Sequence, residues 1–274
     1  MNIKYADNGW TVFIDDDIKT LSNEEILQVG RLCVSNMCVV FKKQKLTPDD
    51  ELRFCSIIGD YQLYPEDYER TKHIRLNHGI LRVTGQKNEH NEEGLFGHTS
   101  ALDWHANQAS NKDRMPLIWL YGDQGTAGSR TSWINNIASY EGLAESTKNK
   151  IKDIKVYCGY KKDMYSLSNF FIDHVHKDHL IDLVQTNKEG KTGLYFPFLQ
   201  IFGFNGYSEN DFKELMDELI QHILNPKYCY HHDWEDGDVI ISEQWLSIHK
   251  RWEFEHMDKR VLHRIAFNYN HLYT

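Results

Sequence analysis

Five polar side chains in this sequence are spaced so that they could do chemistry together. His105 and Asn107 are two residues apart in an apolar stretch typical of a strand, so we expect both side chains on one face. Far downstream, His249 is followed by Arg260 and Arg264 at intervals of 11 and 15 residues. Imidazole nitrogens, with one more polar group, can chelate a divalent metal ion. Two guanidiniums that face one way require a bound carboxylate or another anion.

Taken as a set, these residues resemble the taurine dioxygenase family of iron(II)- and 2-oxoglutarate-dependent oxygenases. The family pattern is a His-x-Asp pair, a Thr after a spacer, a distal His far downstream and an Arg shortly after it. Here 23 residues separate Asn107 from Thr131, and 10 residues separate His249 from Arg260, which fits the family spacing. The stretch 125–143 is similar to the family's Gly-Gly-x-Thr segment and the helix after it. The resemblance covers nearly the whole chain.

The resemblance implies a role for each of these side chains. Iron(II) would take a facial set of protein ligands and keep positions open for a 2-oxo acid and dioxygen. The ligands implied are His105, Asn107 and His249. By the same resemblance, Thr131 and Arg260 bind the distal carboxylate of the co-substrate 2-oxoglutarate. Arg264 would complete the anion-binding side of the site, facing either the substrate or a neighbouring carboxylate.

The expected function is therefore oxidation, most simply hydroxylation, of a C–H bond in a small polar or zwitterionic molecule. This reaction would be coupled to decarboxylation of 2-oxoglutarate to succinate. Arg264 favours an anionic or zwitterionic substrate, such as an amino acid or a sulfonate. The competing function is a non-catalytic ligand-binding descendant, or a member with altered chemistry.

Asn107 departs from the family pattern, which has Asp at this position. The amide has nearly the same shape but no charge, so the site lacks one negative charge and should bind iron more weakly. Four accounts fit: the amide oxygen is a ligand, a water or Asp103 takes the third place, chloride enters as in halogenating relatives, or the chain is inactive, by descent or by engineering. Halogenating relatives have Gly or Ala here, and Asn fills that space, so chloride ranks below the first two. Asp103 is more simply a surface or supporting acid.

A second group of histidines offers an alternative metal site. His174, His176 and His179 have a spacing that could bind zinc on a strand. Their surroundings are hydrophilic, which is more typical of a solvated loop. A zinc hydrolase built on these residues also lacks a candidate general base, and it is the weakest of the three functions.

The elements that must position these residues are predicted from local patterns. The resemblance implies a double-stranded β-helix, the jelly-roll or cupin-like barrel, which is mainly β with flanking helices. Ser22 with Glu25 and Thr47 with Pro48 mark two helix starts, and Ser208 marks a third. Short apolar runs predict buried strands; they are 38–41, 239–241 and 261–269. No repeat or linker marks a boundary, so we expect one domain over residues 1–274.

Composition narrows the partners. The formal net charge of −9 argues against nucleic acid, which binds clustered basic residues. No stretch approaches the ~20 apolar residues that a membrane span needs, so we expect a cytoplasmic enzyme with a small-molecule substrate. The five cysteines form no CxxC pair, which indicates reduced thiols rather than a disulfide framework. A homo-oligomer is compatible with this composition.

Overall fold

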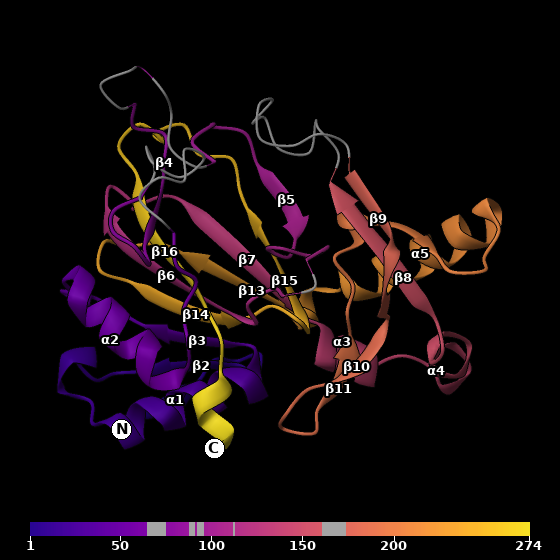
Figure 1. Cartoon of the computed structure of the whole chain (residues 1–274), viewed down its shortest axis with the longest axis horizontal. Coiled ribbons are helices and arrows are strands. Elements are labelled where there is room, and N and C mark those ends of the chain that lie inside the picture. The colour runs from indigo at the N-terminus through magenta and orange to yellow at the C-terminus, as the bar shows by residue number, and fades with distance from the viewer. Residues whose placement is uncertain (65–74, 88–90, 92–95, 112, 161–173) are drawn as a thin grey trace.

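Two antiparallel sheets of the barrel are the frame of this computed structural model, which describes residues 1–64, 75–87, 91, 96–111, 113–160 and 174–274. The seven-stranded sheet has the order β1-β2-β3-β14-β6-β16-β4, and the four-stranded sheet has the order β13-β7-β15-β5. All neighbours pair antiparallel except β2 and β3, which are parallel. Helices α1 and α2 cover the outer side of the larger sheet (Figure 1). This is the jelly-roll architecture that the sequence predicted.

The strands of the larger sheet are β1 (Ile3–Tyr5), β2 (Thr11–Ile14), β3 (Cys38–Phe41), β4 (Leu81–Thr84), β6 (Leu117–Gln124), β14 (Val239–Glu243) and β16 (Val261–Phe267). Those of the smaller sheet are β5 (Leu102–His105), β7 (Arg130–Asn135), β13 (Cys229–Asp233) and β15 (Ser247–Arg251). A separate three-stranded sheet contains β8 (Lys155–Tyr160), β9 (His174–Asp182) and β12 (Ile201–Phe204), and β10 (Val184–Thr186) pairs with β11 (Thr192–Leu194). The longer helices are α1 (Asn23–Asn36), α2 (Pro48–Ile58), α3 (Asn136–Glu141), α4 (Glu145–Ile151) and α5 (Glu209–Ile223).

Local signals place the helices as expected. Ser22 accepts from the backbone of Glu25, whose carboxylate returns to the backbone N–H of Ser22, so the capping box at α1 is confirmed. Thr47 and Asp50 form the same box at α2. Ser208 caps α5, which ends at Ile223 before the predicted Asn-Pro stop. Each cap fixes where a helix begins, and the apolar face of that helix then sets its packing.

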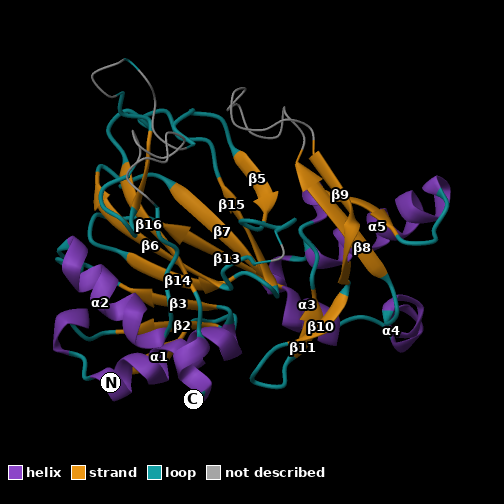
Figure 2. Cartoon of the chain, viewed as in Figure 1, coloured by secondary structure: helices purple, strands orange, loops and turns teal. Residues whose placement is uncertain are grey.

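Besides smaller clusters, the described residues form two large hydrophobic clusters. One lies between the larger sheet and the first two helices, where Phe54 contacts Phe41 and Trp119 at ring-centroid distances of 6.2 and 5.1 Å. The other joins α5 to β8 and β12 through buried residues such as Leu215 and Phe204. Figure 2 shows that β8, β9 and α5 lie beside the barrel rather than on its outer face. No helix in the described ranges is long and apolar enough to cross a membrane.

The structure corrects one expectation about the histidine-rich segment. Residues 174–182 form strand β9, not a solvated loop. Antiparallel pairing with β8, in which Tyr157 is opposite Leu180, gives the polar segment backbone partners that a loop would lack. The side chains of 174–178 lie outside the described part of the structure, so zinc binding by this cluster stays untested.

Candidate active site

A pair of neighbouring strands brings the two distant histidines together. His105 ends β5 and lies opposite His249 of β15 in the strand register, and their ring centroids are 4.2 Å apart. Burial lowers the pKa of His105 to about 4 and lowers the pKa of His249 well below its usual value. Both rings are therefore neutral near pH 7. The Nδ1 atom of His105 donates to the Asp103 carbonyl at 2.6 Å, which leaves Nε2 with its lone pair for a ligand.

Asn107 reaches the same cavity from a turn rather than from a strand. We expected it on the strand of His105, but β5 ends at His105 and Asn107 belongs to the turn that follows. Its backbone N–H donates to Gln244 Oε1 at 3.1 Å, while Gln244 Nε2 donates to the Met115 carbonyl at 2.6 Å. The Asn107 amide nitrogen lies 3.4 Å from His249 Nε2, and a half-turn of the amide would present its oxygen there.

Asp103 does not share this position. Its carboxylate accepts from the backbone N–H of Trp104 at 2.9 Å and pairs with Lys250 at 3.0 Å. The Asp103 side chain is 53% exposed and does not line the cavity. This geometry favours the supporting role over direct metal ligation.

Arg260 is the buried cation of the site. It is 1% exposed; its Nε donates to Ser129 Oγ at 3.1 Å, and Nη1 lies 3.9 Å from Met257 Sδ. Within the described residues it pairs with no carboxylate. Burial, and secondarily the charge of Arg251, lower its pKa to about 9, so it remains protonated near pH 7. A buried guanidinium with only neutral partners is suited to receive an anionic ligand.

Thr131 lies on the same cavity and has a hydroxyl proton to donate. Its Oγ1 accepts from Trp234 Nε1 at 2.9 Å, so the O–H points to another acceptor. A carboxylate between Thr131 and Arg260 would accept both donors. Arg264 also lines the cavity; its Nη1 is 3.5 Å from the Tyr64 hydroxyl, and its buried Nε has no hydrogen-bond partner.

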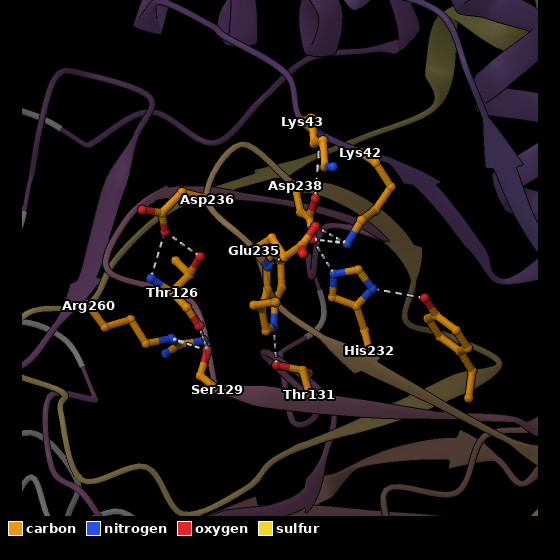
Figure 3. A network of polar contacts seen from close by, with 12 residues as sticks. Lys42, Lys43, Thr126, Ser129, Thr131, His232, Glu235, Asp236, Asp238 and Arg260 are labelled. Atoms are coloured by element: carbon orange, nitrogen blue, oxygen red, sulfur yellow. Dashed lines mark hydrogen bonds and ion pairs between the residues drawn. The ribbon is translucent and has the colours of Figure 1, made fainter.

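A layer of polar contacts holds these cofactor-binding candidates in place (Figure 3). Asp236 accepts from the backbone and hydroxyl of Thr126, both at 2.7 Å, and the Thr126 carbonyl accepts from Ser129 Oγ at 2.7 Å. Ser129 in turn accepts from Arg260, so a surface turn is linked to the buried guanidinium in three steps. Nearby, His232 lies 3.0 Å from Asp238, which also pairs with Lys42 at 2.5 Å.

The cavity thus contains every side chain that the sequence singled out for the site. It is lined from the larger sheet by β4, β6 and β16 and from the smaller sheet by β5, β7 and β15, so it lies between the two sheets. The predicted residues that line it are His105, Asn107, Thr131, His249, Arg260 and Arg264.

Sequence reasoning missed one cationic residue of the cavity. Arg251 is 5% exposed and donates to the backbone carbonyls of Phe96, His98 and Ser100. Burial lowers its pKa to about 10. The signal was available, because Arg251 is two residues after His249 and therefore shares its face on the strand. Arg251 holds residues 96–100 against the site.

The donor set fits iron(II) and 2-oxoglutarate, with one difference from the usual triad. Two neutral imidazoles and an amide oxygen can ligate a divalent metal, and the buried guanidinium with the threonine hydroxyl can bind a carboxylate. Among the residues that the structure describes, no group of three or more His, Cys, Asp or Glu side chains is arranged for a metal ion. Beside the two imidazoles, the described lining of this cavity contains Asn107 and no carboxylate.

Known proteins are similar to this chain in sequence and in structure. The model of the family described as "Taurine catabolism dioxygenase TauD, TfdA family" matches residues 10–266. An alpha-ketoglutarate-dependent 2,4-dichlorophenoxyacetate dioxygenase of a Burkholderia strain is 21% identical over 89% of this chain and 86% of its own length. Pentalenolactone F synthase of Streptomyces arenae is 25% identical over a shorter stretch, 31% of this chain and 28% of that protein.

Solved structures show the same fold. AAD-2, solved in complex with Mn(II) and N-oxalylglycine, superposes with a TM-score of 0.76 at 17% identity, covering 97% of this chain and 96% of the other. A taurine dioxygenase from Burkholderia xenovorans superposes with a TM-score of 0.74 at 17% identity, covering 94% and 85%. The family match spans both halves of the barrel and the whole cavity, and this chain belongs to the TauD/TfdA family of alpha-ketoglutarate-dependent dioxygenases.

Proposed function

We propose that this protein oxidises, most simply by hydroxylation, a C–H bond of a small polar or zwitterionic molecule. The reaction consumes dioxygen and decarboxylates 2-oxoglutarate to succinate. The observation that carries the proposal is Arg260, a cation with 1% exposure and no carboxylate partner among the described residues, in the same cavity as His105 and His249.

In this proposal the chain's own residues bind and orient the reactants. His105, His249 and the Asn107 amide oxygen hold iron(II), which when bound supplies the activation of dioxygen. Thr131 and Arg260 receive the distal carboxylate of 2-oxoglutarate, and the Ser129 hydroxyl keeps the guanidinium turned toward it. The surrounding apolar side chains, Val83, Leu102, Leu120 and Leu262, exclude water from the reaction.

The substrate class follows from the remaining charges. Arg264 lines the cavity, and its buried Nε has no hydrogen-bond partner among the described residues, so it can receive a second anionic group. We assign Arg264 to an anionic group of the substrate. This assignment favours an amino acid, a sulfonate or a similar small anion or zwitterion.

Anaerobic titration with iron(II) and 2-oxoglutarate tests the proposal. The complete site should give a visible charge-transfer band that grows with 2-oxoglutarate. Arg260→Ala should lose it, because the bound carboxylate loses its charged bidentate partner at a cost of about 2–5 kcal/mol. Arg260→Lys should fail largely as well, since an ammonium lacks the planar fork. Arg130→Ala, which removes an exposed arginine paired with Asp233, is the matched control. Unchanged 2-oxoglutarate affinity in Arg260→Ala would contradict the assignment.

A non-catalytic or altered-chemistry protein is the second candidate, favoured by the neutral Asn107 and by the lack of any carboxylate among the residues that line the described cavity. A non-catalytic chain should bind 2-oxoglutarate without forming succinate, whereas a chain with altered chemistry would still form it. Succinate measured under air, with iron(II) and a panel of amino acids and sulfonates, therefore separates an active chain from a non-catalytic one. Halide incorporation in the same assay would identify the chloride chemistry.

A further inference from the structure

A second cavity lies away from the candidate active site, beside strands β9 and β10. Its volume is about 430 Å³, and none of its lining residues lines the histidine cavity. Apolar side chains such as Leu180 and Val184 form one part of the wall, and Arg114 and Trp245 form another. Trp245 also borders an adjoining cavity of about 390 Å³. A space of this size accommodates a small metabolite.

Arg114 is a buried cation without a hydrogen-bond partner. It is 5% exposed, and its Nε, Nη1 and Nη2 atoms all lack an acceptor in the part of the chain that the structure describes. The guanidinium carbon lies 3.9 Å from the centroid of the Tyr195 ring and 3.5 Å from that of Trp245. Both rings thus pack against the guanidinium. The Trp245 Nε1 atom is likewise buried and has no partner among the described residues. Arg114 and Trp245 together present unsatisfied hydrogen-bond donors at a cavity whose lining also includes Asp182.

The nearby carboxylates do not satisfy these donors. The buried Glu243 accepts from the backbone N–H groups of Trp245 and Leu246 at 2.9 and 2.8 Å, and it forms no ion pair with Arg114. Asp182, which lines the cavity, pairs instead with Lys155 at 2.5 Å. A buried guanidinium without acceptors is strongly unfavourable. We therefore expect a bound molecule from outside the chain to accept its hydrogen bonds.

We infer that the cavity bordered by Arg114 and Trp245 binds a small oxyanion, a carboxylate or phosphate group carried by a small molecule. The anion would accept from the edge of the guanidinium and from the indole N–H, and the apolar wall would contact the rest of the molecule. Neither the metal-binding residues nor Arg260 takes part. The inference is therefore independent of the proposed oxygenase function.

Calorimetric titration of the whole chain tests this site with inorganic phosphate and acetate, with chloride at equal ionic strength as the reference. Because Arg260 is a second anion-binding candidate, the titrations are repeated in an Arg260→Ala background. We expect a saturable component in both backgrounds. Arg114→Met keeps the length of the side chain and removes its donors, so it should weaken this component by about ten- to a hundredfold.

Three further variants test whether the binding depends on the donors of Arg114 and Trp245 rather than on loss of an arginine or on misfolding. Trp245→Phe keeps the ring and removes one donor, so it should weaken anion binding less than Arg114→Met does. Arg31→Met, which removes an arginine that donates to the Leu272 carbonyl elsewhere, should bind as the parent does. If Arg114→Met does not fold, anion affinity is measured in Arg114→Lys instead. This variant keeps the charge but loses the planar fork of the guanidinium, so it should also bind the anion more weakly. No saturable binding of either anion by the parent, or equal binding in the parent and the Arg114 variant, would overturn the inference.

Discussion

In the proposed metal site, Asn107 sets the charge that the protein contributes. With Asp the protein would contribute one negative charge to the metal, and with Asn it contributes none. Asn107→Asp should therefore bind iron(II) at least about tenfold more tightly, the scale on which metal-site partners usually act. Equilibrium dialysis measures this affinity directly. Succinate production should rise if the chain is an ordinary hydroxylase. If the amide is instead a ligand suited to a different reaction, the rate of that native reaction should fall, or its product should change to a hydroxylated one.

Asn107→Gly is the companion variant, because it vacates the position without adding charge. Halogenation that is gained only in this variant would show that the parent does not halogenate. If iron affinity and 2-oxoglutarate turnover are identical in the parent and in both variants, Asn107 is not a ligand, and water takes its place.

His105 makes the stability of the metal-free protein depend on pH. Burial lowers its pKa from 6.5 to about 4, so between these values the unfolded chain binds a proton that the folded chain does not. The free energy of unfolding therefore falls as pH drops from 6.5 toward 4, and this contribution is constant above 6.5. At pH 5 the loss from this residue is about 2 kcal/mol.

Urea unfolding in a chelator at pH 7 and pH 5 measures this effect. The loss in the parent should exceed the loss in His105→Gln, which retains a polar side chain but does not titrate. Equal losses in the two proteins would mean that His105 is not desolvated in the folded state.

At the scale of elements, the turn before β14 depends on Gly237. Its φ is +91°, and a Cβ there would lie 2.6 Å from the Gln44 carbonyl oxygen. Gly237→Ala should destabilise the fold by more than the ~1–2 kcal/mol that left-handed backbone alone costs. Gly9→Ala is the matched control, because Gly9 has a φ of +74° and nothing within 4 Å of its Cβ position. Urea midpoints compare the stability of the two variants. If both lose the same stability, the close contact with Gln44 does not contribute to the cost at Gly237.

Local sequence predicted those elements whose signals are local. The capping boxes at α1 and α2 and the apolar run of β3 depend on neighbouring residues, and they appear where expected. Strand β9 was wrongly predicted as a loop because its first residues are hydrophilic and lack the apolar pattern of a buried strand, although they pair with β8. Asn107 was expected on a strand because alternation alone does not reveal where a strand ends. The six site residues were identified by spacing and family resemblance together, whereas their hydrogen-bond partners, such as Gln244, depend on tertiary contacts that no local pattern records.

For the molecule as a whole, the two hydrophobic clusters bear on whether residues 1–274 form one cooperative unit. Helix α3 contacts α5, β11 and β15, so it joins the second cluster to the barrel. We predict a single unfolding transition in which far-ultraviolet circular dichroism and tryptophan fluorescence coincide in urea. Two separated transitions would instead assign the segment around β8, β9 and α5 to an independent unit.

The charge of the whole molecule contrasts with the charge of its interior. The chain carries a net charge of −9, yet the described cavity between the sheets is lined by Arg251, Arg260 and Arg264 and by no acid. The acidic surface repels polyanions at long range, while the buried guanidiniums act only on small anions that enter the cavity. The distribution of charge therefore favours small anionic ligands over polyanions.

The Gln244 amide has a consequence for how the chain receives a metal. Because it accepts from the Asn107 backbone N–H and donates to the Met115 carbonyl, the turn after β5 is tied to the segment that follows β14 and to the residues before β6. The conformational entropy of that turn is lost during folding rather than during binding. In the proposed metal site, this preorganisation compensates in part for the missing carboxylate, since the turn that carries Asn107 needs no ordering when the ion binds.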